Sequence, residues 1–174
     1  TVTVSTPSGT TSLPAVGYDT GLLLKFNPQG SLLWNVRVGN RDAGIYKVIT
    51  DSNGNVYFTG GQRSWSSGTA GTMVDGTGAS SSVSNPGTGN VFLVKLDSQG
   101  KRVFAHAIGN RGSGGGGATS ISDLKLDESG NLNLVGSYSA DEVTFNSTTS
   151  TTIKLPASSQ SIGFIVKYST DGVP

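Results

Sequence analysis

Residues 51–55, Asp-Ser-Asn-Gly-Asn, place oxygen-bearing side chains at the spacing found in the first half of a calcium-binding loop. In that interpretation Asp51, Asn53 and Asn55 would be metal ligands. Calcium takes about 6–8 oxygen ligands, however, and the twelfth loop position holds Gln62 in place of the glutamate that usually completes the site. Asp and Asn also stabilise tight turns by accepting hydrogen bonds from their own backbone. We therefore expect a turn between two strands and no cofactor, with calcium as the alternative.

A second group of candidate residues would bind an organic ligand. Trp65 lies in the polar stretch RSWSSGT, where an aromatic ring can stack on a sugar or a peptide, although it can equally fold back onto its own sheet. Gln62 and Arg63 precede it, and Tyr138 stands at the start of a comparable stretch later in the chain. Aromatic and arginine side chains dominate binding hot spots because they bury a large area at low entropic cost. We predict a ligand-binding group of Trp65, Arg63, Gln62 and Tyr138.

Residues suited to catalysis are scarce. The chain has one histidine and no cysteine, which excludes disulfides, thiolate nucleophiles, zinc–thiolate sites and sites with several histidines. The histidine, His106, is expected to be an exposed or half-buried strand residue and not a catalytic base. The acidic and phenolic residues of the expected long loops are Asp42, Asp75, Tyr138, Asp141 and Glu142. Asp141 and Glu142 are adjacent, so in an extended chain their side chains point to opposite sides. We expect no enzyme, with a carbohydrate-active hydrolase or lyase as the alternative.

The overall composition excludes two classes of partner. Lys and Arg number 12 and Asp and Glu number 11, so the chain lacks the positive charge by which proteins attract nucleic acids or anionic membranes. No stretch approaches the ~18 consecutive apolar residues of a transmembrane helix. We therefore expect neither nucleic-acid binding nor membrane insertion. The charged fraction of 13%, the 26 glycines and the absent cysteine suit an extracellular or cell-surface protein.

Segments of the chain repeat one sequence pattern. GLLLKFNPQGSLLWNVRVGNR from Gly21 returns as VFLVKLDSQGKRVFAHAIGNR from Val91 and begins again as GFIVKYSTDG from Gly163. IYKVITDSNGNVYFTGG from Ile45 returns as ISDLKLDESGNLNLVGS from Ile121. Internal similarity at a period of about 70 residues indicates a repeat architecture, of which the chain holds about two and a half copies.

Each repeated block reads as β-structure. Segments such as 21–27 and 55–61 show the period-two alternation and the β-branched and aromatic residues typical of strands. Turns such as 27–30, 97–100 and 127–130 place glycine where a hairpin requires a positive φ. One repeat is therefore two tight hairpins, or four antiparallel strands, which we name A to D. Because tandem four-stranded units are typical of propeller blades, the sequence predicts an all-β fold of propeller-type blades.

The order of three motifs resembles a known family. The motifs are F-x-V-K-[LFY]-[DNS]-x-x-G, an aromatic strand ending in Gly-Asn, and [VI]-x-D-x-x-G-N-[VL]-Y-x-[TV]-G. Together they resemble the bacterial β-propeller repeat family called SBBP over residues 21–174. The resemblance implies an extracellular or surface setting and fixes no ligand. The chain departs from a compact blade in its long stretches 62–89 and 138–161.

Analogy with related propellers assigns the strands and the domain boundaries. Strand A ends at Asp51 or Asp127, and the other strands are B at 55–61 and 131–137, C at 21–27, 90–97 and 163–169, and D at 32–38 and 102–108. The chain then divides into a partial blade at 1–42, a complete blade at 43–110 with a long insertion between B and C, and a partial blade at 111–174. Propellers close with about 4–8 blades, and natural sheets avoid open edges. We therefore expect a partial propeller whose strand edges pair with flanking repeats or with further copies of the chain.

The connections are divided unequally between the two ends of such blades. The A–B and C–D turns are short, whereas the B–C connections at 62–89 and 138–162 and the D–A connections at 39–44 and 109–118 share the other end. The β-prone stretches TMVDG, VTF and TIKL are expected to add small hairpins at that end. Long loops on a rigid scaffold commonly carry recognition. We predict a non-catalytic structural, adhesive or self-assembling scaffold whose long-loop end binds a glycan or a surface protein.

Overall fold

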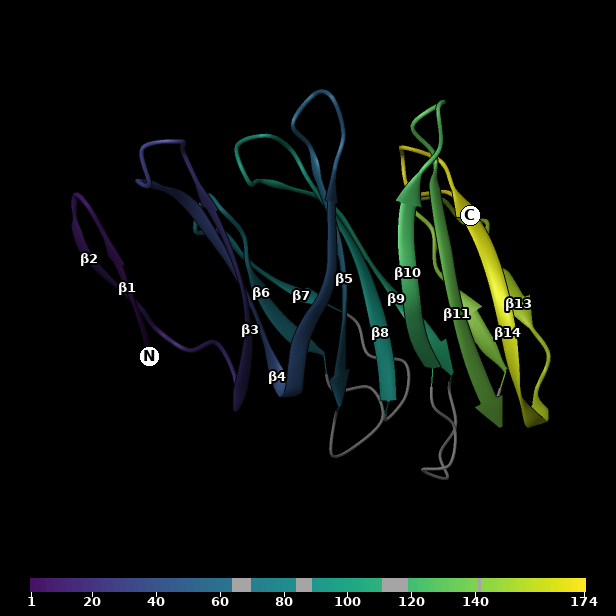
Figure 1. Ribbon diagram of the computed structural model, residues 1–174. Coiled ribbons are helices and arrows are strands. Elements are labelled where there is room, and N and C mark those ends of the chain that lie inside the picture. The colour runs from purple at the N-terminus through teal and green to yellow at the C-terminus, as the bar shows by residue number, and fades with distance from the viewer. Residues whose placement is uncertain (64–69, 84–88, 111–118, 141) are drawn as a thin grey trace.

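The computed structural model describes residues 1–63, 70–83, 89–110, 119–140 and 142–174, and of 40–42, 62–63, 89–90, 110 and 140 it describes the backbone only. The strands are β1 (Val2–Thr6), β2 (Gly9–Leu13), β3 (Asp19–Phe26), β4 (Leu32–Thr50), β5 (Val56–Arg63), β6 (Gly71–Val74), β7 (Ser80–Val83), β8 (Gly89–Leu96), β9 (Arg102–Asn110), β10 (Thr119–Leu126), β11 (Leu132–Ala140), β12 (Val143–Phe145), β13 (Ile153–Leu155) and β14 (Ser158–Tyr168). The described residues contain no helix, so the predicted all-β class is confirmed. Within them, accordingly, no helix has the length and apolar character needed to cross a membrane. Figure 1 shows the sheets one after another across the molecule, from β1 and β2 at one side to β13 and β14 at the other.

Three groups of paired strands make up most of the structure, and we name them by position. The N-terminal sheet contains β3, the first part of β4, β6 and β7, the middle sheet contains the second part of β4, β5, β8, β9, β12 and β13, and the C-terminal sheet contains β10, β11 and β14. All pairs are antiparallel, and no sheet in the described part of the chain closes on itself. The consecutive order β4–β5–β8–β9 follows the predicted order of strands A, B, C and D, and β10–β11–β14 follows A, B and C.

The longest strand, β4, belongs to two sheets. Its first part pairs with β3 and its second part pairs with β5, so the chain passes from one sheet into the next within a single strand. The prediction of a D–A loop at 39–44 is therefore wrong, because these residues lie inside β4. The register shifts between Arg41 and Gly44 and again between Ile45 and Lys47. Such bulges bend a strand and increase its twist, which allows one strand to serve two sheets.

Inserted hairpins extend the sheet of the preceding repeat. β6 pairs with the first part of β4, and β12 pairs with β9, in each case beside a strand D. TMVDG, VTF and TIKL contribute to these strands, so their β-structure is confirmed, but their expected position is wrong. The turn after β6 reaches the end of the molecule where the short turns lie, and the N–H of Gly76 there donates to the carbonyl of Gly100 at 2.7 Å. The hairpins cross the molecule because the outer edge of strand D offers unpaired backbone groups that they satisfy.

The paired strands are joined by short turns of one design. Gly100 has φ of +82°, and its N–H donates to the carbonyl of Asp97 at 3.0 Å. The N–H of Asp97 in turn donates to the carbonyl of Lys101 at 2.9 Å. The same two bonds close the turns that contain Gly30, Gly54, Gly130 and Gly172, all with positive φ. The predicted glycine turns are therefore confirmed. Glycine suits these positions because a side chain is disfavoured in that backbone region.

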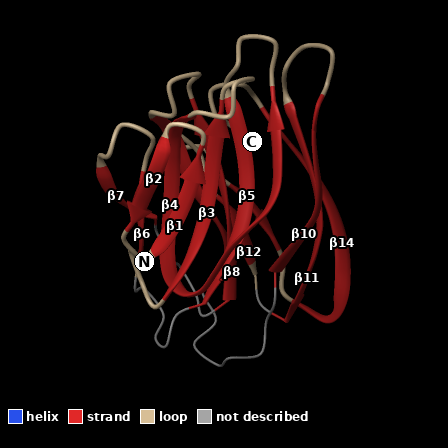
Figure 2. Cartoon of the chain, turned by 60° about the vertical axis from the view of Figure 1, so that its left-hand side comes forward, coloured by secondary structure: helices blue, strands red, loops and turns tan. Residues whose placement is uncertain are grey.

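Two apolar clusters fill the spaces between the three sheets, whose strands Figure 2 shows from a second direction. Phe58 and Phe92 of the middle sheet meet edge to face, 6.1 Å between centroids, and pack toward Trp34 of the N-terminal sheet. Their neighbours Tyr57 and Leu93 pack toward the C-terminal sheet. Successive residues of a strand point to opposite faces, so a sheet covered on both sides needs apolar residues at both. This is why Val91–Val94 is an unbroken apolar run.

Candidate functional site

Asp51, the central residue of the calcium candidate, directs both carboxylate oxygens into its own turn. Oδ1 accepts the N–H groups of Asn53 at 3.0 Å and Asn55 at 2.9 Å. Oδ2 accepts the side-chain amide of Asn55 at 2.8 Å and the hydroxyl of Tyr57 at 3.1 Å. Partial burial favours the neutral acid, but these hydrogen bonds outweigh it and lower the pKa of Asp51. The predicted turn is present, and a calcium ion would have to compete with these donors for the carboxylate oxygens.

Elsewhere in the part of the chain that the structure describes, acidic and histidine side chains do not gather into a metal site either. Across the described residues, no group of three or more His, Cys, Asp or Glu side chains could hold a metal ion. Asp127 occupies the same turn position as Asp51 and accepts the N–H of Asn131 at 2.8 Å. It also forms an ion pair with Lys167 at 2.6 Å. The bond from Lys167 is the main cause that lowers the pKa of Asp127 to about 2.

Tyr138, a predicted ligand-binding residue, lies within strand β11 and not in a loop. Its ring is 3% exposed and packs in the cluster between the middle and C-terminal sheets, tilted against Phe164 at 6.3 Å. Its hydroxyl donates to the carbonyl of Pro156 at 2.9 Å. The period of the strand explains this place, because Leu132 and Leu134 point to the same face. The expectation that Tyr138 opens an exposed loop is therefore corrected, and almost none of its surface is left for a ligand.

The other three predicted ligand-binding residues are Gln62, Arg63 and Trp65, and the structure describes the backbone of the first two at the end of β5. Gln62 and Arg63 are the last two residues of that strand, where their backbones pair with Asn90 and Gly89. Their side chains and the whole of Trp65 lie outside the described residues. The structure therefore places the beginning of this group at the end of the molecule opposite the short turns (Figure 1) and leaves its ligand contacts as a prediction.

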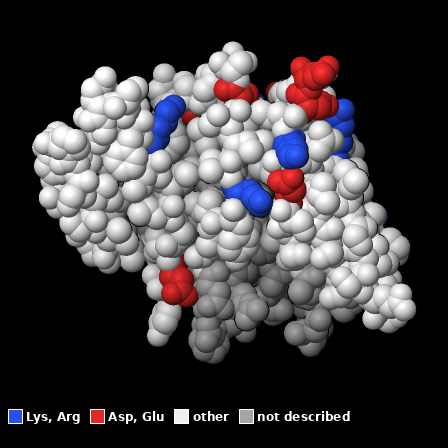
Figure 3. All heavy atoms as spheres, viewed as in Figure 1, with Lys and Arg blue, Asp and Glu red and all other residues white. Residues whose placement is uncertain are grey.

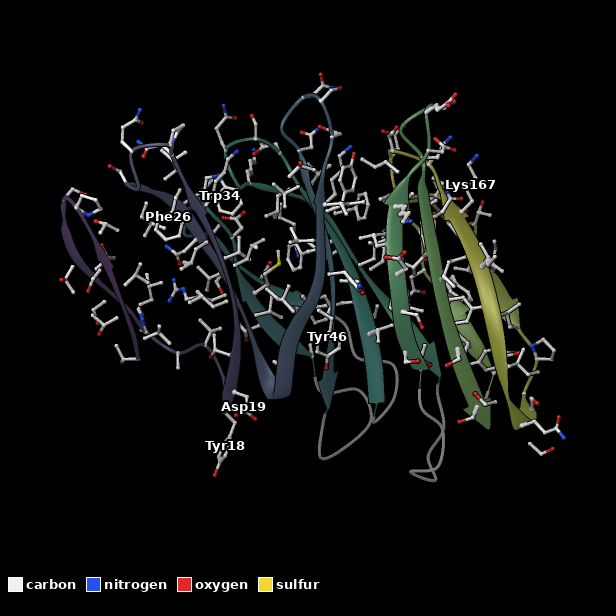
Figure 4. The ribbon with its side chains drawn as sticks, viewed as in Figure 1. Tyr18, Asp19, Phe26, Trp34, Tyr46 and Lys167 are labelled. Carbon is white, nitrogen blue, oxygen red and sulfur yellow. The ribbon has the colours of Figure 1, made fainter. Side chains whose placement is uncertain are left out.

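Tyr46 is an exposed aromatic beside Gly61 of β5 that sequence reasoning missed. It lies at the bulge in β4 and is 58% exposed. A Cβ on Gly61 would lie 2.7 Å from its hydroxyl, and a Cβ on Gly44 2.9 Å from its ring, so the absence of two side chains makes room for it. Figure 4 shows it on the part of β4 nearer the long connections, with Tyr18 farther out beyond β3. The signal in the sequence was glycine at positions 44 and 61.

His106 is buried and not exposed or half-buried as expected. Its ring stacks on Phe104 with 4.6 Å between centroids and an interplanar angle of 13°, and it faces Tyr168 at 6.0 Å. Nε2 lies 2.9 Å from the carbonyl oxygen of Gly172, which can only accept, so Nε2 donates. Burial lowers the pKa of His106, and the hydrogen bond to Gly172 opposes that effect only in part. The C–D turn of the next repeat covers this side chain, which strand periodicity alone does not show.

The described candidates for acid or base catalysis are used by the fold. The carboxylate of Asp75 accepts the N–H and the hydroxyl of Thr77 at 2.9 and 2.6 Å, and the N–H of Arg102 at 3.0 Å. It thereby ties the β6–β7 turn to the start of β9. Although burial opposes it, these bonds lower the pKa of Asp75. Glu142 forms an ion pair with Lys154 at 2.8 Å, and the side chains of 42 and 141 lie outside the described residues.

Charged side chains are sparse on the face shown in Figure 3, and most lie toward the end that carries the short turns.

Comparisons with protein families, with curated proteins and with solved structures find no match to this chain. A function has to be inferred from the repeat pattern and from the geometry described above.

Proposed function

We propose that the chain is a segment of propeller-type repeats, of the kind that the SBBP family comprises, and that it serves as a non-catalytic scaffold of an extracellular or cell-surface protein. The observation that carries this proposal is one contact that recurs between successive repeats. The ammonium group of Lys25 donates to the carbonyl of Ser98 at 3.1 Å, and that of Lys95 donates to the carbonyl of Thr170 at 2.8 Å. Both acceptors are the second residue of a C–D turn. A side chain that makes the same contact in two successive copies serves architecture, since a catalytic site needs its groups in one place.

The strand order and the packing of the sheets also support an arrangement as propeller blades. The middle sheet runs A–B–C–D as consecutive antiparallel strands, and two apolar clusters separate it from the sheets before and after it. Each blade of a propeller is a four-stranded antiparallel sheet that packs face to face against its neighbours. The boundaries 1–42, 43–110 and 111–174 then stand for a partial, a complete and a partial blade. The strand from 32 to 50 crosses the first of these boundaries without a break.

A binding surface in this proposal lies at the end of the molecule where β5 leads into its long connection. Tyr46 adds an exposed ring next to the strand that carries Gln62 and Arg63, with Trp65 two residues farther on. Aromatic rings stack on the apolar faces of sugars and bury a large area with few rotatable bonds. A glycan or a glycosylated surface protein is the class of ligand that this composition suits.

The test combines a glycan array with a screen of glycosidase and lyase substrates. We expect glycan binding without turnover, and Trp65→Ala to weaken that binding by about 1–3 kcal/mol. Tyr46→Ala should weaken it in the same direction. Leu33→Ala, which changes an exposed apolar residue of β4, is the matched control and should leave binding unchanged.

Two results would contradict the proposal. Turnover of a glycan that is abolished by Asp141→Ala would favour the carbohydrate-active hydrolase or lyase. Binding that survives both aromatic substitutions would place the ligand elsewhere on the molecule.

A further inference from the structure

The outer side of the C-terminal sheet carries the docking residues of a repeat with nothing described against them. Ile165 is 76% exposed, whereas Leu93, two residues before the lysine in the preceding copy, is fully buried. Val135 is also exposed, while Thr59 at the same repeat position is buried. In the middle sheet this side is covered by the C-terminal sheet. The outer side of the C-terminal sheet is therefore equivalent to the side of the middle sheet that is buried against the next sheet.

Lys167 lies on the same outer side of the C-terminal sheet as Ile165. It is the third residue of the series to which Lys25 and Lys95 belong, and those two bind a turn carbonyl of the following repeat. Lys167 instead forms its ion pair with Asp127 of its own sheet. A lysine ammonium has three N–H donors, so this ion pair leaves donors for a further acceptor.

The β1–β2 hairpin lies beside the outer side of the N-terminal sheet (Figures 1 and 2), and the part of this side around Phe26 is exposed and carries the complementary surface. Leu22, Leu24 and Phe26 alternate with the residues that face the middle sheet. Phe26 is 43% exposed, whereas Leu96 and Tyr168 at the same repeat position are fully buried. In the middle sheet, Leu96 and its neighbours on that side pack against the sheet that precedes them. Figure 4 shows Phe26 and Lys167 at opposite sides of the stack of sheets.

On the basis of the proposed repeat architecture, we infer that the outer side of the C-terminal sheet docks onto the outer side of the N-terminal sheet of a second copy of this chain, and that Lys167 there donates to the backbone carbonyl of Pro28. Pro28 is the second residue of its C–D turn, as Ser98 and Thr170 are in the two contacts within the chain. The association continues the interface that the chain builds twice internally. The two surfaces differ, so the packing is head to tail and forms rings or open chains of copies, not a symmetric dimer.

Two exposed residues of similar character lie off this interface and provide matched controls. Leu33 and Val103 share a repeat position, and both are 55% exposed. Val103 stays exposed although its sheet has a neighbour on either side, so this position is not covered by packing between repeats.

The experiment is sedimentation velocity of the full chain from about 1 µM to about 1 mM, because small interfaces bind weakly. We expect the mass of the wild type to rise with concentration beyond that of a dimer. Ile165→Asp and Phe26→Asp should each be monomeric, since each blocks one surface. A mixture of the two should form heterodimers and nothing larger, because each variant retains one intact surface. Val103→Asp and Leu33→Asp should associate as the wild type does, and circular dichroism should show all variants folded.

Lys167→Met gives a second, milder perturbation that keeps the apolar stem of the side chain. It should raise the dissociation constant about tenfold, as expected for the loss of one charged hydrogen bond. A wild type that remains monomeric up to the highest concentration would overturn the inference and assign this surface to another occupant. A Phe26→Asp variant that still dimerises while Ile165→Asp does not would overturn it in favour of symmetric packing. Trp65→Ala should leave the association unchanged, so failure of the proposed ligand binding and failure of this inference are separate results.

Discussion

Replacing Trp34 with alanine would open a hole between the N-terminal and middle sheets. The indole is 7% exposed and belongs to the apolar cluster that joins these sheets. Its Nε1 donates to the carbonyl of Ser98 at 3.3 Å, and the ammonium of Lys25 lies 5.5 Å from the ring centroid. The ring also covers Gly100, where a Cβ would lie 2.8 Å from it. Truncation therefore removes apolar, hydrogen-bonding and cation–π contacts together.

The expected loss of unfolding free energy is about 3–5 kcal/mol, the range for truncating a buried aromatic residue. The hydrogen bond accounts for about 1 kcal/mol of this, and the cation–π contact for about 0.5–1 kcal/mol. Most of the loss thus comes from the apolar contacts and the cavity. Trp34→Phe, which introduces the residue found at the same repeat position as Phe104, should cost only about 1–2 kcal/mol because it keeps most of these contacts.

Urea unfolding followed by far-ultraviolet circular dichroism measures these differences. Trp65→Ala is the matched control, since the sequence places that tryptophan in a polar loop, and it should change the unfolding free energy by less than about 0.5 kcal/mol. A loss below about 1 kcal/mol for Trp34→Ala, or a large loss for Trp65→Ala, would refute the assignment of core and loop. Separate transitions for the sheets would show that they unfold independently, in which case the first transition is the relevant one.

Two further predictions concern pH. Burial lowers the pKa of His106 below the unfolded value of about 6.5, so between these two values the unfolded chain binds a proton at this residue and the folded chain does not. The unfolding free energy should therefore fall as pH drops below about 6.5. His106→Phe should flatten this slope in urea melts at pH 5 to 7. The folded pKa of Asp127 is about 2, below the unfolded value of about 3.9, so its contribution is present above about pH 4 and is lost as pH falls toward 2. In an NMR titration, Lys167→Met should raise the pKa of Asp127 toward its ordinary value while Lys95→Met should not, and an unchanged pKa in Lys167→Met would contradict the ion pair.

The strands and their short turns could be predicted because their causes are local. A period of two and a glycine at a position of positive φ are properties of a few neighbouring residues. Asp51 shows the same for the candidate sites, because its turn needs only the four residues that follow it to satisfy most of its carboxylate. Internal repetition extended these local predictions to the order of strands in each sheet.

Residues whose surroundings come from another repeat could not be placed in this way. Tyr138 was expected to open an exposed loop and His106 to be exposed or half-buried, and both are buried within strands. Their burial depends on Phe164 and on the turn at Gly172, which belong to strands and turns far along the chain. Only the packing of one sheet on the next decides these contacts.

The sequence alone determined the class of the fold, the strand order within each repeat and the turns, because hydrogen bonding between neighbouring strands follows from local pattern and repetition. The tertiary structure decided that one strand from 32 to 50 serves two sheets and that the inserted hairpins β6–β7 and β12–β13 extend the preceding sheet. It also decided which equivalent residues are buried, as Leu93 and Ile165 show. These outcomes depend on free backbone edges and on neighbouring faces, and both exist only once the sheets are packed together.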